Sequence, residues 1–290
     1  MPMTSEGHRR LDRAALPPLF RTIDGLSVRF VESGPHEAEA LLLSPWPESV
    51  FAYEQIWSRL AGRAHLVAVD LPGFGRSTGR DALMSPRAMG DFIVRIADAF
   101  GLERPHVVAP DVGTSAALFA AALQPGRLAS LVVGSGGAAF PLRLEGVLRE
   151  WVFAPSVDAY RRIGGRKIVE SVIQTFDRRT LSEAAREDYL ASYEGDRFAD
   201  SMRYVRSYPL ELELLRDVLP HVQTPVQIIA GRKDPVVPLV NAEYLVQRLP
   251  HSRLHVLDTG HFTWEEAADD YAAVVESWWS VHNTAASCTV

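Results

Sequence analysis

Cysteine is almost absent from this sequence of 290 residues, which contains a single one, Cys288. One thiol cannot form an internal disulfide, and it cannot supply a cysteine-based metal site. Such sparse use of cysteine is typical of a reducing compartment, so we expect a cytoplasmic protein. We expect neither a metal ion nor an organic cofactor.

Long apolar runs and a surplus of positive charge are also missing. No apolar run approaches the length that spans a membrane, and the polar first residues do not resemble a secretory signal. The net charge is −6, and the basic residues, nearly all arginine, are scattered among acidic ones. A nucleic-acid-binding face and a membrane segment are therefore not expected. The expected partners are water and a small organic substrate of apolar to amphipathic character, and a homodimer remains open.

Short apolar runs alternate with helical segments along most of the chain. With 47% hydrophobic and 23% charged residues, the sequence can bury a large core. The expected fold class is α/β, a mostly parallel central sheet flanked by helices with an inserted helical cap. The predicted parts are core residues 1–138, with a loose arm over residues 1–18, cap residues 139–220, and core residues 221–290. The predicted strands are residues 20–23, 27–32, 40–44, 66–69, 107–110, 128–133, 225–230 and 254–257.

The apolar run over residues 107–110 stops at an acidic residue, Asp111, before an Ala-rich helical segment. Small residues surround Asp111 with the spacing of a GxSxG nucleophile elbow, in which Asp replaces Ser. They must be small because the turn from strand to helix is tight and strained. A carboxylate in this position would attack a saturated carbon and form an ester that must then be hydrolysed. The alternative is that Asp111 only caps the helix over residues 112–123.

Two further polar residues follow predicted strands late in the chain, Asp234 after residues 225–230 and His261 after residues 254–257. Parallel sheets gather the carboxyl ends of their strands at one edge, so we expect Asp111, Asp234 and His261 to lie together. Taken alone, His261 could be a structural loop histidine and Asp234 a helix-capping acid. Their joint occurrence at strand ends favours a catalytic set.

The chain from about residue 20 to residue 279 resembles the α/β-hydrolase superfamily. The chain order of nucleophile, acid and histidine matches that arrangement. Residues 70–77, Asp-Leu-Pro-Gly-Phe-Gly-Arg-Ser, look like a DxPGxGxS turn, and residues 46–49, Trp-Pro-Glu-Ser, look like the second half of an HGxPxS loop. Together with Gly260-His261, these motifs resemble the branch with an Asp nucleophile, which contains epoxide hydrolases and haloalkane dehalogenases.

The resemblance implies a mechanism for these residues. Asp111 would attack carbon to form an alkyl ester, and His261, oriented by Asp234, would activate the water that hydrolyses it. The backbone N–H groups of Trp46 and Val112 would bind the oxyanion, because they occupy the loop position and the position after the nucleophile.

The same two positions help to choose between the chemistries of this branch. Dehalogenases typically have Trp after the nucleophile and often Asn in the loop, both of which donate to halide, whereas here the residues are Val112 and Trp46. Epoxide hydrolases instead use cap tyrosines, since a phenol donates a proton yet stays protonated at neutral pH. Tyr204 is the candidate, because residues 202–206 resemble the NWYR stretch of that family. The alternative for Tyr204 is packing within the cap.

Several positions depart from the family pattern. The first cap tyrosine has no clean counterpart: Trp151 lies in that segment and could position the substrate through its indole N–H, Tyr160 lies slightly beyond it, and Tyr208 is a further substitute. Ser44-Pro45 replaces His-Gly, so this loop must be held in another way. Pro110 stands where epoxide hydrolases commonly have His.

The sequence therefore predicts an epoxide hydrolase that forms a covalent ester on Asp111. One alternative is a haloalkane or haloacid dehalogenase that uses the same nucleophile. Another is a binding protein that has kept the fold and lost hydrolysis, because fold alone does not determine function.

Overall fold

The computed structural model describes residues 18–175 and 181–283, so Cys288 and all of the predicted arm except Pro18 lie outside the described residues. The described chain forms one sheet of eight strands in the order β1-β2-β4-β3-β5-β6-β7-β8. The first two pairings, β1 with β2 and β2 with β4, are antiparallel, and all others are parallel. The strands are β1 (Leu19–Ile23), β2 (Leu26–Glu32), β3 (Glu39–Leu43), β4 (His65–Val69), β5 (His106–Pro110), β6 (Ser130–Gly134), β7 (Val226–Gly231) and β8 (Ser252–Leu257).

The expected mostly parallel sheet is therefore confirmed, with its strands displaced by only one or two residues from most of the predicted ranges. Asp24-Gly25 forms the hairpin turn between β1 and β2, and both residues have positive φ, 50° and 76°. Two such residues are typical of a type I′ turn, whose twist matches that of the strands. β5 and β6 are buried along their whole lengths, as continuous apolar strands of a parallel sheet must be.

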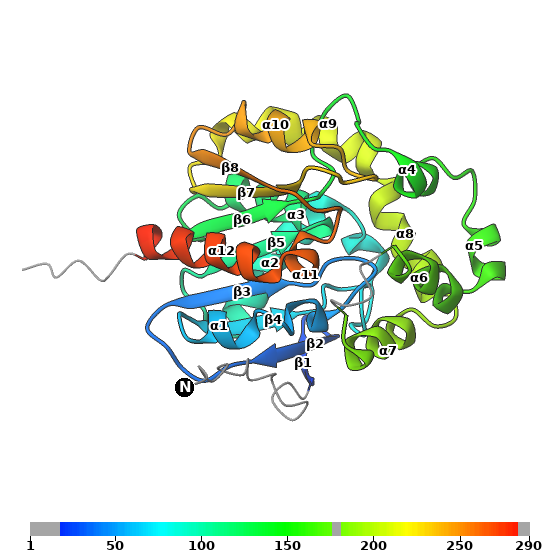
Figure 1. Ribbon diagram of the computed structural model, residues 1–290, viewed down its shortest axis with the longest axis horizontal. Coiled ribbons are helices and arrows are strands. Elements are labelled where there is room, and N and C mark those ends of the chain that lie inside the picture. The colour runs from blue at the N-terminus through cyan, green and yellow to red at the C-terminus, as the bar shows by residue number, and fades with distance from the viewer. Residues whose placement is uncertain (1–17, 176–180, 284–290) are drawn as a thin grey trace, which may run out of the picture.

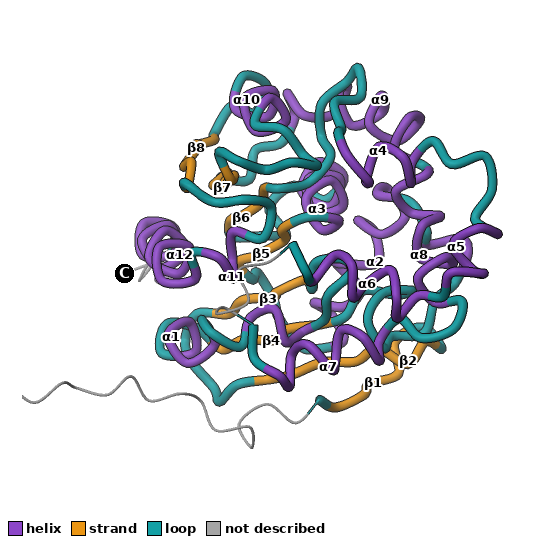
Figure 2. The backbone as a smooth tube through the Cα atoms, turned by 45° about the vertical axis from the view of Figure 1, so that its right-hand side comes forward, coloured by secondary structure: helices purple, strands orange, loops and turns teal. Residues whose placement is uncertain are grey.

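Helices cover both faces of the sheet. Figure 2 shows α1 and α12 on one face and α2 and α3 on the other. The helices of the core are α1 (Trp57–Ala61), α2 (Pro86–Ala99), α3 (Val112–Leu123), α10 (Val240–Val246), α11 (Thr263–Glu266) and α12 (Ala268–His282). Between β3 and β4, a 3-10 turn over Val50–Tyr53 is followed by the short α1.

The segment between β6 and β7 contains the helices of the predicted cap. Most of them gather beyond one end of the sheet, to the right in Figure 1, whereas the last one packs against α3 of the core. The helices are α4 (Gly146–Val152), α5 (Asp158–Ile163), α6 (Gly165–Ile173), α7 (Glu183–Ser192), α8 (Arg197–Arg206) and α9 (Tyr208–Val218). Because the carboxyl ends of β5, β7 and β8 lead into the loops next to these helices, a site at the strand ends is enclosed by the cap.

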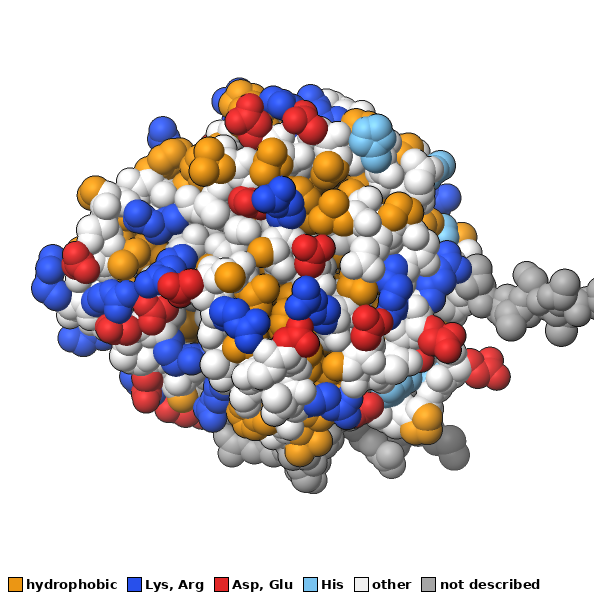
Figure 3. All heavy atoms as spheres, turned by 180° about the vertical axis from the view of Figure 1, so that it is seen from behind, with side chains coloured by type: hydrophobic (Ala, Val, Ile, Leu, Met, Phe, Trp, Pro, Cys, Tyr) orange, Lys and Arg blue, Asp and Glu red, His pale blue; other side chains and the backbone are white. Residues whose placement is uncertain are grey.

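The surface carries both signs of charge. On the face shown in Figure 3, side chains of Lys and Arg are interspersed with those of Asp and Glu. This agrees with the scattered distribution of arginine along the sequence. Among the described helices, none is long and apolar enough to cross a membrane.

Candidate active site

Asp111 lies at the sharp turn between β5 and α3. Its φ of 51° and ψ of −122° form a backbone conformation that L-residues rarely adopt. Thr114 braces the turn, because its Oγ1 lies 3.1 Å from the carbonyl oxygen of Ala109 and accepts a hydrogen bond from the N–H of Gly134 at 3.0 Å. A Cβ at Gly136 would lie 2.2 Å from the carbonyl oxygen of Asp111, so only glycine permits this approach. The Asp111 side chain makes no capping hydrogen bond to α3, so the helix-cap alternative is wrong.

The three residues predicted to form a set lie together. His261 Nδ1 is 2.7 Å from Asp234 Oδ2, and His261 Nε2 is 3.7 Å from Asp111 Oδ1. The other oxygen of Asp234 accepts hydrogen bonds from the N–H groups of Val236 at 2.9 Å and Val237 at 2.8 Å. The backbone thus fixes Asp234, and Asp234 fixes the imidazole. Asp111, Asp234 and His261 are at most 9% exposed.

Electrostatics keep His261 protonated in this arrangement. Burial lowers the pKa of His261, but the negative charges of Asp234 and Asp111 outweigh burial and raise the pKa to about 10. The resting site therefore contains an imidazolium between two carboxylates at neutral pH. If Asp111 lost its charge, one cause of the raised pKa would disappear and His261 would release its proton more easily.

The backbone N–H of Trp46 donates to Asp111 Oδ2 at 2.6 Å, as expected for one of the two oxyanion donors. The second expected donor, the N–H of Val112, belongs to the first residue of α3. Among the described residues, no hydrogen bond joins this N–H to the Asp111 carboxylate. The two oxygens of Asp111 are consequently distinct: Oδ2 is held by the loop, and Oδ1 faces His261.

A cavity of about 330 Å³ opens over Asp111 and His261 between the core and the cap. Its wall is mainly apolar, and Lys233 and Glu266 contribute charge. Glu266 Oε2 also accepts the N–H of Gly260 at 2.7 Å and so supports the loop before His261. The lining residues are Trp46, Pro47, Asp111, Val147, Leu148, Trp151, Ser171, Val172, Thr175, Lys233, Pro235, Val236, Gly260, His261, Phe262 and Glu266. No described group of three or more His, Cys, Asp and Glu side chains is arranged to hold a metal ion.

The cap residues predicted to face Asp111 divide into two groups. Trp151 lines the cavity, as expected of a residue that positions the substrate. Tyr204 does not: it is fully buried on α8, and its hydroxyl donates to the carbonyl oxygen of Val112 at 2.9 Å. Burial also raises the pKa of Tyr204, which makes the phenol a weaker acid. Tyr208 is buried beside it, with ring centroids 5.9 Å apart, and Tyr160 is not among the lining residues either.

The expectation that Tyr204 supplies a proton to the substrate is therefore wrong. Helical spacing predicts which residues share a face of α8, but the packing of α8 against the core decides which face meets the cavity.

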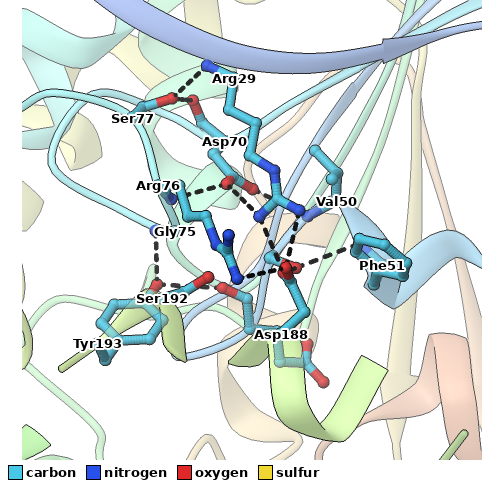
Figure 4. A network of polar contacts seen from close by, with 12 residues as sticks. Arg29, Val50, Phe51, Asp70, Gly75, Arg76, Ser77, Asp188, Ser192 and Tyr193 are labelled. Atoms are coloured by element: carbon cyan, nitrogen blue, oxygen red, sulfur yellow. Dashed lines mark hydrogen bonds and ion pairs between the residues drawn. The ribbon is translucent and has the colours of Figure 1, made fainter. Parts of the chain in front are cut away.

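The turn over residues 70–77 supports the site from outside the cavity. The carboxylate of Asp70 accepts the N–H groups of Val50 at 2.8 Å and Arg76 at 2.9 Å. Arg29 lies beside it and binds Asp188 of the cap helix α7, as Figure 4 shows. The motif recognised in the sequence thus joins the core to the cap. Asp188 could not be recognised from the sequence, because its partner Arg29 lies 159 residues away.

A buried pair of carboxyl groups, Glu48 and Glu265, was also missed by sequence reasoning. Trp264 Nε1 donates to Glu48 Oε2 at 2.9 Å, and Tyr189 of the cap donates to Glu265 Oε1 at 2.8 Å. Burial and the charge of Glu265 raise the pKa of Glu48, and burial raises the pKa of Glu265 to about 7. Because the pKa values of both acids are raised, the pair holds a proton in the neutral range.

A family model described as the alpha/beta hydrolase fold matches residues 41–268. The chain belongs to this family. The α/β hydrolase is 29% identical over 231 residues to a 2-hydroxymuconate semialdehyde hydrolase of Pseudomonas sp. strain CF600, a match that covers 76% of this chain and 78% of that protein. The predicted superfamily and the assignment as a hydrolase are thereby confirmed.

Solved structures of other α/β hydrolases share the fold. An esterase from Thermogutta terrifontis superposes with a TM-score of 0.75 at 20% identity and covers 92% of this chain and 99% of its own. An epoxide hydrolase from Vigna radiata superposes with a TM-score of 0.76 at 18% identity and covers 93% of this chain and 99% of its own. At such identities the likeness establishes the fold alone, and the chemistry of this α/β hydrolase depends on its own residues.

Proposed function

We propose that this α/β hydrolase opens an epoxide to a vicinal diol through an ester formed on Asp111. The proposal rests on the different surroundings of the two carboxylate oxygens. Oδ2 accepts the N–H of Trp46 at 2.6 Å, and Oδ1 lies 3.7 Å from His261 Nε2. The held oxygen can become the carbonyl oxygen of an ester, while Oδ1 is placed to attack carbon.

In the first step, a bond forms between Asp111 Oδ1 and a ring carbon, and the bond from that carbon to the epoxide oxygen breaks. The indole N–H of Trp151 can stabilise the departing oxygen by a hydrogen bond. Esterification removes the charge of Asp111, so His261 gives up its proton, and this proton neutralises the alkoxide through solvent. The products of the step are a hydroxyalkyl ester and a neutral imidazole.

In the second step, His261 Nε2 takes a proton from a water molecule that attacks the ester carbon of Asp111. Negative charge then develops on Oδ2, where the N–H of Trp46 stabilises it. Collapse of this intermediate breaks the bond to the former Oδ1 atom, which leaves with the diol and takes up the remaining proton of the added hydroxyl, while the water oxygen stays in the carboxylate of Asp111. The imidazolium and the carboxylate of the resting site are restored.

Two observations bear on the leaving group. The indole N–H of Trp46 donates to Ser201 Oγ at 2.8 Å and Val112 has no side-chain donor, so neither can cradle a halide as in dehalogenases. This favours the epoxide, whose ring strain assists opening. The absence of a tyrosine hydroxyl among the described lining residues instead favours a group that leaves without a proton. Haloalkanes or haloacids are therefore the second candidate.

A single turnover in water enriched in heavy oxygen tests the proposal. With excess enzyme and an aryl-substituted epoxide, the first diol should be unlabelled, and the label should appear in the peptide that contains Asp111. Label in the first diol would contradict a covalent ester. Halide release from a matched series of haloalkanes, measured in parallel, distinguishes the second candidate.

The variant Asp111→Asn separates hydrolysis from mere binding. Under either hydrolytic reaction, turnover should fall to the level of the uncatalysed reaction, because the amide cannot attack carbon. If the wild-type protein bound its ligands without converting them, and the variant bound them equally well, the chain would be a binding protein on this fold.

A further inference from the structure

The side chain of Trp46 connects the core loop of residues 44–49 to the cap. It is 3% exposed, and its Nε1 donates to Ser201 Oγ of α8 at 2.8 Å. Its ring stacks on Phe198 of α8, with centroids 5.0 Å apart, and meets Trp151 of α4 edge-on at 5.1 Å. The residue that contacts Asp111 through its backbone is therefore anchored by its side chain in the cap.

The core holds the ends of this loop, through Val69 at Ser44 and through Trp264 at Glu48. Pro45 lacks an N–H and stands where the family has glycine. Further contacts of the loop also come from the cap, since Tyr193 donates to the carbonyl oxygen of Glu48 at 3.2 Å and Ser49 donates to Asp188 Oδ2 at 2.6 Å. The course of the loop around Trp46 therefore depends on the cap as well as on the core.

We propose that Ser201 is a positioning residue, which fixes the N–H of Trp46 against Asp111 Oδ2 by holding the indole in the cap. Ser201 is fully buried, and its hydroxyl donates to the carbonyl oxygen of Phe198 at 2.7 Å, which leaves its oxygen free to accept the indole N–H. The inference rests on the proposed function, because the charge that this N–H stabilises grows on Oδ2 when water attacks the ester. Loss of Ser201 should therefore slow ester hydrolysis more than ester formation.

The variant Ser201→Ala removes the acceptor of the indole N–H. Ser207→Ala is the matched control, because Ser207 ends the same helix and its hydroxyl makes the same kind of bond, to the carbonyl oxygen of Tyr204 at 2.6 Å. Trp46→Phe removes the hydrogen bond from the other side. Rapid quenching followed by mass spectrometry of the Asp111 peptide measures ester formation and ester hydrolysis separately.

We expect ester hydrolysis to slow about tenfold in Ser201→Ala, less than the loss of a whole oxyanion donor, while ester formation changes less. The ester should accumulate, kcat should fall, and Ser207→Ala should match the wild type. Combining Trp46→Phe with Ser201→Ala should cost less than the sum of the two single effects. Equal slowing of both steps, or additive effects, would overturn the assignment.

Amide hydrogen exchange of Trp46 provides a readout that needs no substrate. The Trp46 amide should exchange about tenfold faster in Ser201→Ala than in the wild type or in Ser207→Ala, because the loop opens more readily. Unchanged exchange would refute the positioning role even if an ester forms. Faster exchange in a protein whose wild type forms no ester would uphold the coupling of loop and cap and reject the proposed function.

Discussion

The guanidinium of Arg29 binds both carboxylate oxygens of Asp188 at 2.8 Å, and this bidentate contact joins β2 of the core to α7 of the cap. Both side chains are buried, and Asp70 lies 3.4 Å from the same guanidinium. Arg76 adds a second cation 3.1 Å from Asp188. The cap therefore meets the core through a buried ionic network, where a broken pair costs more than on the surface.

We expect Asp188→Asn to lower the free energy of unfolding by about 3 kcal/mol, because Arg29 would keep its buried charge and lose its bidentate partner. Chemical denaturation measures the loss. Glu187→Gln is the control: Glu187 is the preceding residue of α7 and pairs with the half-exposed Arg166 at 2.8 Å. This exposed pair should contribute much less to stability than the buried one, because water screens its charges. Equal effects of the two variants would show that the network does not stabilise the fold.

The raised pKa of His261 predicts how the protein responds to pH. The pKa of about 10 exceeds that of an unfolded histidine, so protonation of His261 stabilises the folded state. This stabilisation is fully present below about pH 6.5 and is lost as the pH rises towards 10. Asp111→Asn should lower the pKa of His261, since it removes one of the two neighbouring charges. Titration of the imidazole signals by NMR measures this shift, and the signals of the exposed His255 serve as an internal control. An unchanged pKa in the variant would contradict the electrostatic coupling.

The buried pair of Glu48 and Glu265 predicts a second dependence on pH. Folding raises the pKa of Glu265 to about 7, so the protonated carboxyl stabilises the folded state. This contribution to the free energy of unfolding is lost as the pH rises through 7. Glu265→Gln keeps an uncharged side chain at every pH. Between about pH 5 and pH 8, the free energy of unfolding of the wild type should therefore fall by about 2 kcal/mol relative to this variant. The exposed carboxyl of Glu213, replaced in Glu213→Gln, should give no such relative change in denaturation experiments.

Gly75 is required by the turn that surrounds Asp70. Its φ is 51°, and an added Cβ would lie 2.1 Å from Asp70 Oδ2. We expect Gly75→Ala to destabilise the fold by about 3 kcal/mol, from backbone strain together with the clash. Gly101→Ala tests strain alone, because Gly101 has φ 70° and no atom within 4 Å of an added Cβ. The free energy of unfolding of this control should fall by about 1 kcal/mol. A similar fall in both variants would show that the clash with Asp70 does not contribute.

The three central residues of the candidate site could be predicted from the sequence because a local pattern of neighbouring residues marks each of them. An apolar run that ends in an acid between small residues specifies the elbow at Asp111, and the parallel sheet brings Asp234 and His261 to the same edge. The backbone donor at Trp46 follows from its place in the loop.

The cap and the buried ionic contacts could not be predicted in this way. Whether Tyr204 or Trp151 faces the cavity depends on how α4 and α8 are oriented about their axes relative to the core. The spacing of residues within either helix does not determine this orientation. The contact between Arg29 and Asp188 joins residues 159 positions apart, and each of them alone looks like an ordinary surface charge.

The different positions of Trp151 and Tyr204 lead to opposite kinetic predictions. Trp151→Phe keeps an aromatic ring in the cavity and removes the only polar group of that side chain, so ester formation from an epoxide should slow by about tenfold or more. Tyr204→Phe removes a hydroxyl that is bound to the carbonyl oxygen of Val112, so kcat should change by less than about threefold while stability falls by about 1 kcal/mol. Rapid-quench measurement of the Asp111 ester and denaturation of both variants provide the comparison. A large loss of ester formation in Tyr204→Phe, with Trp151→Phe unaffected, would contradict this prediction. Tyr204 would then be the proton donor, and α8 would have to turn towards the substrate.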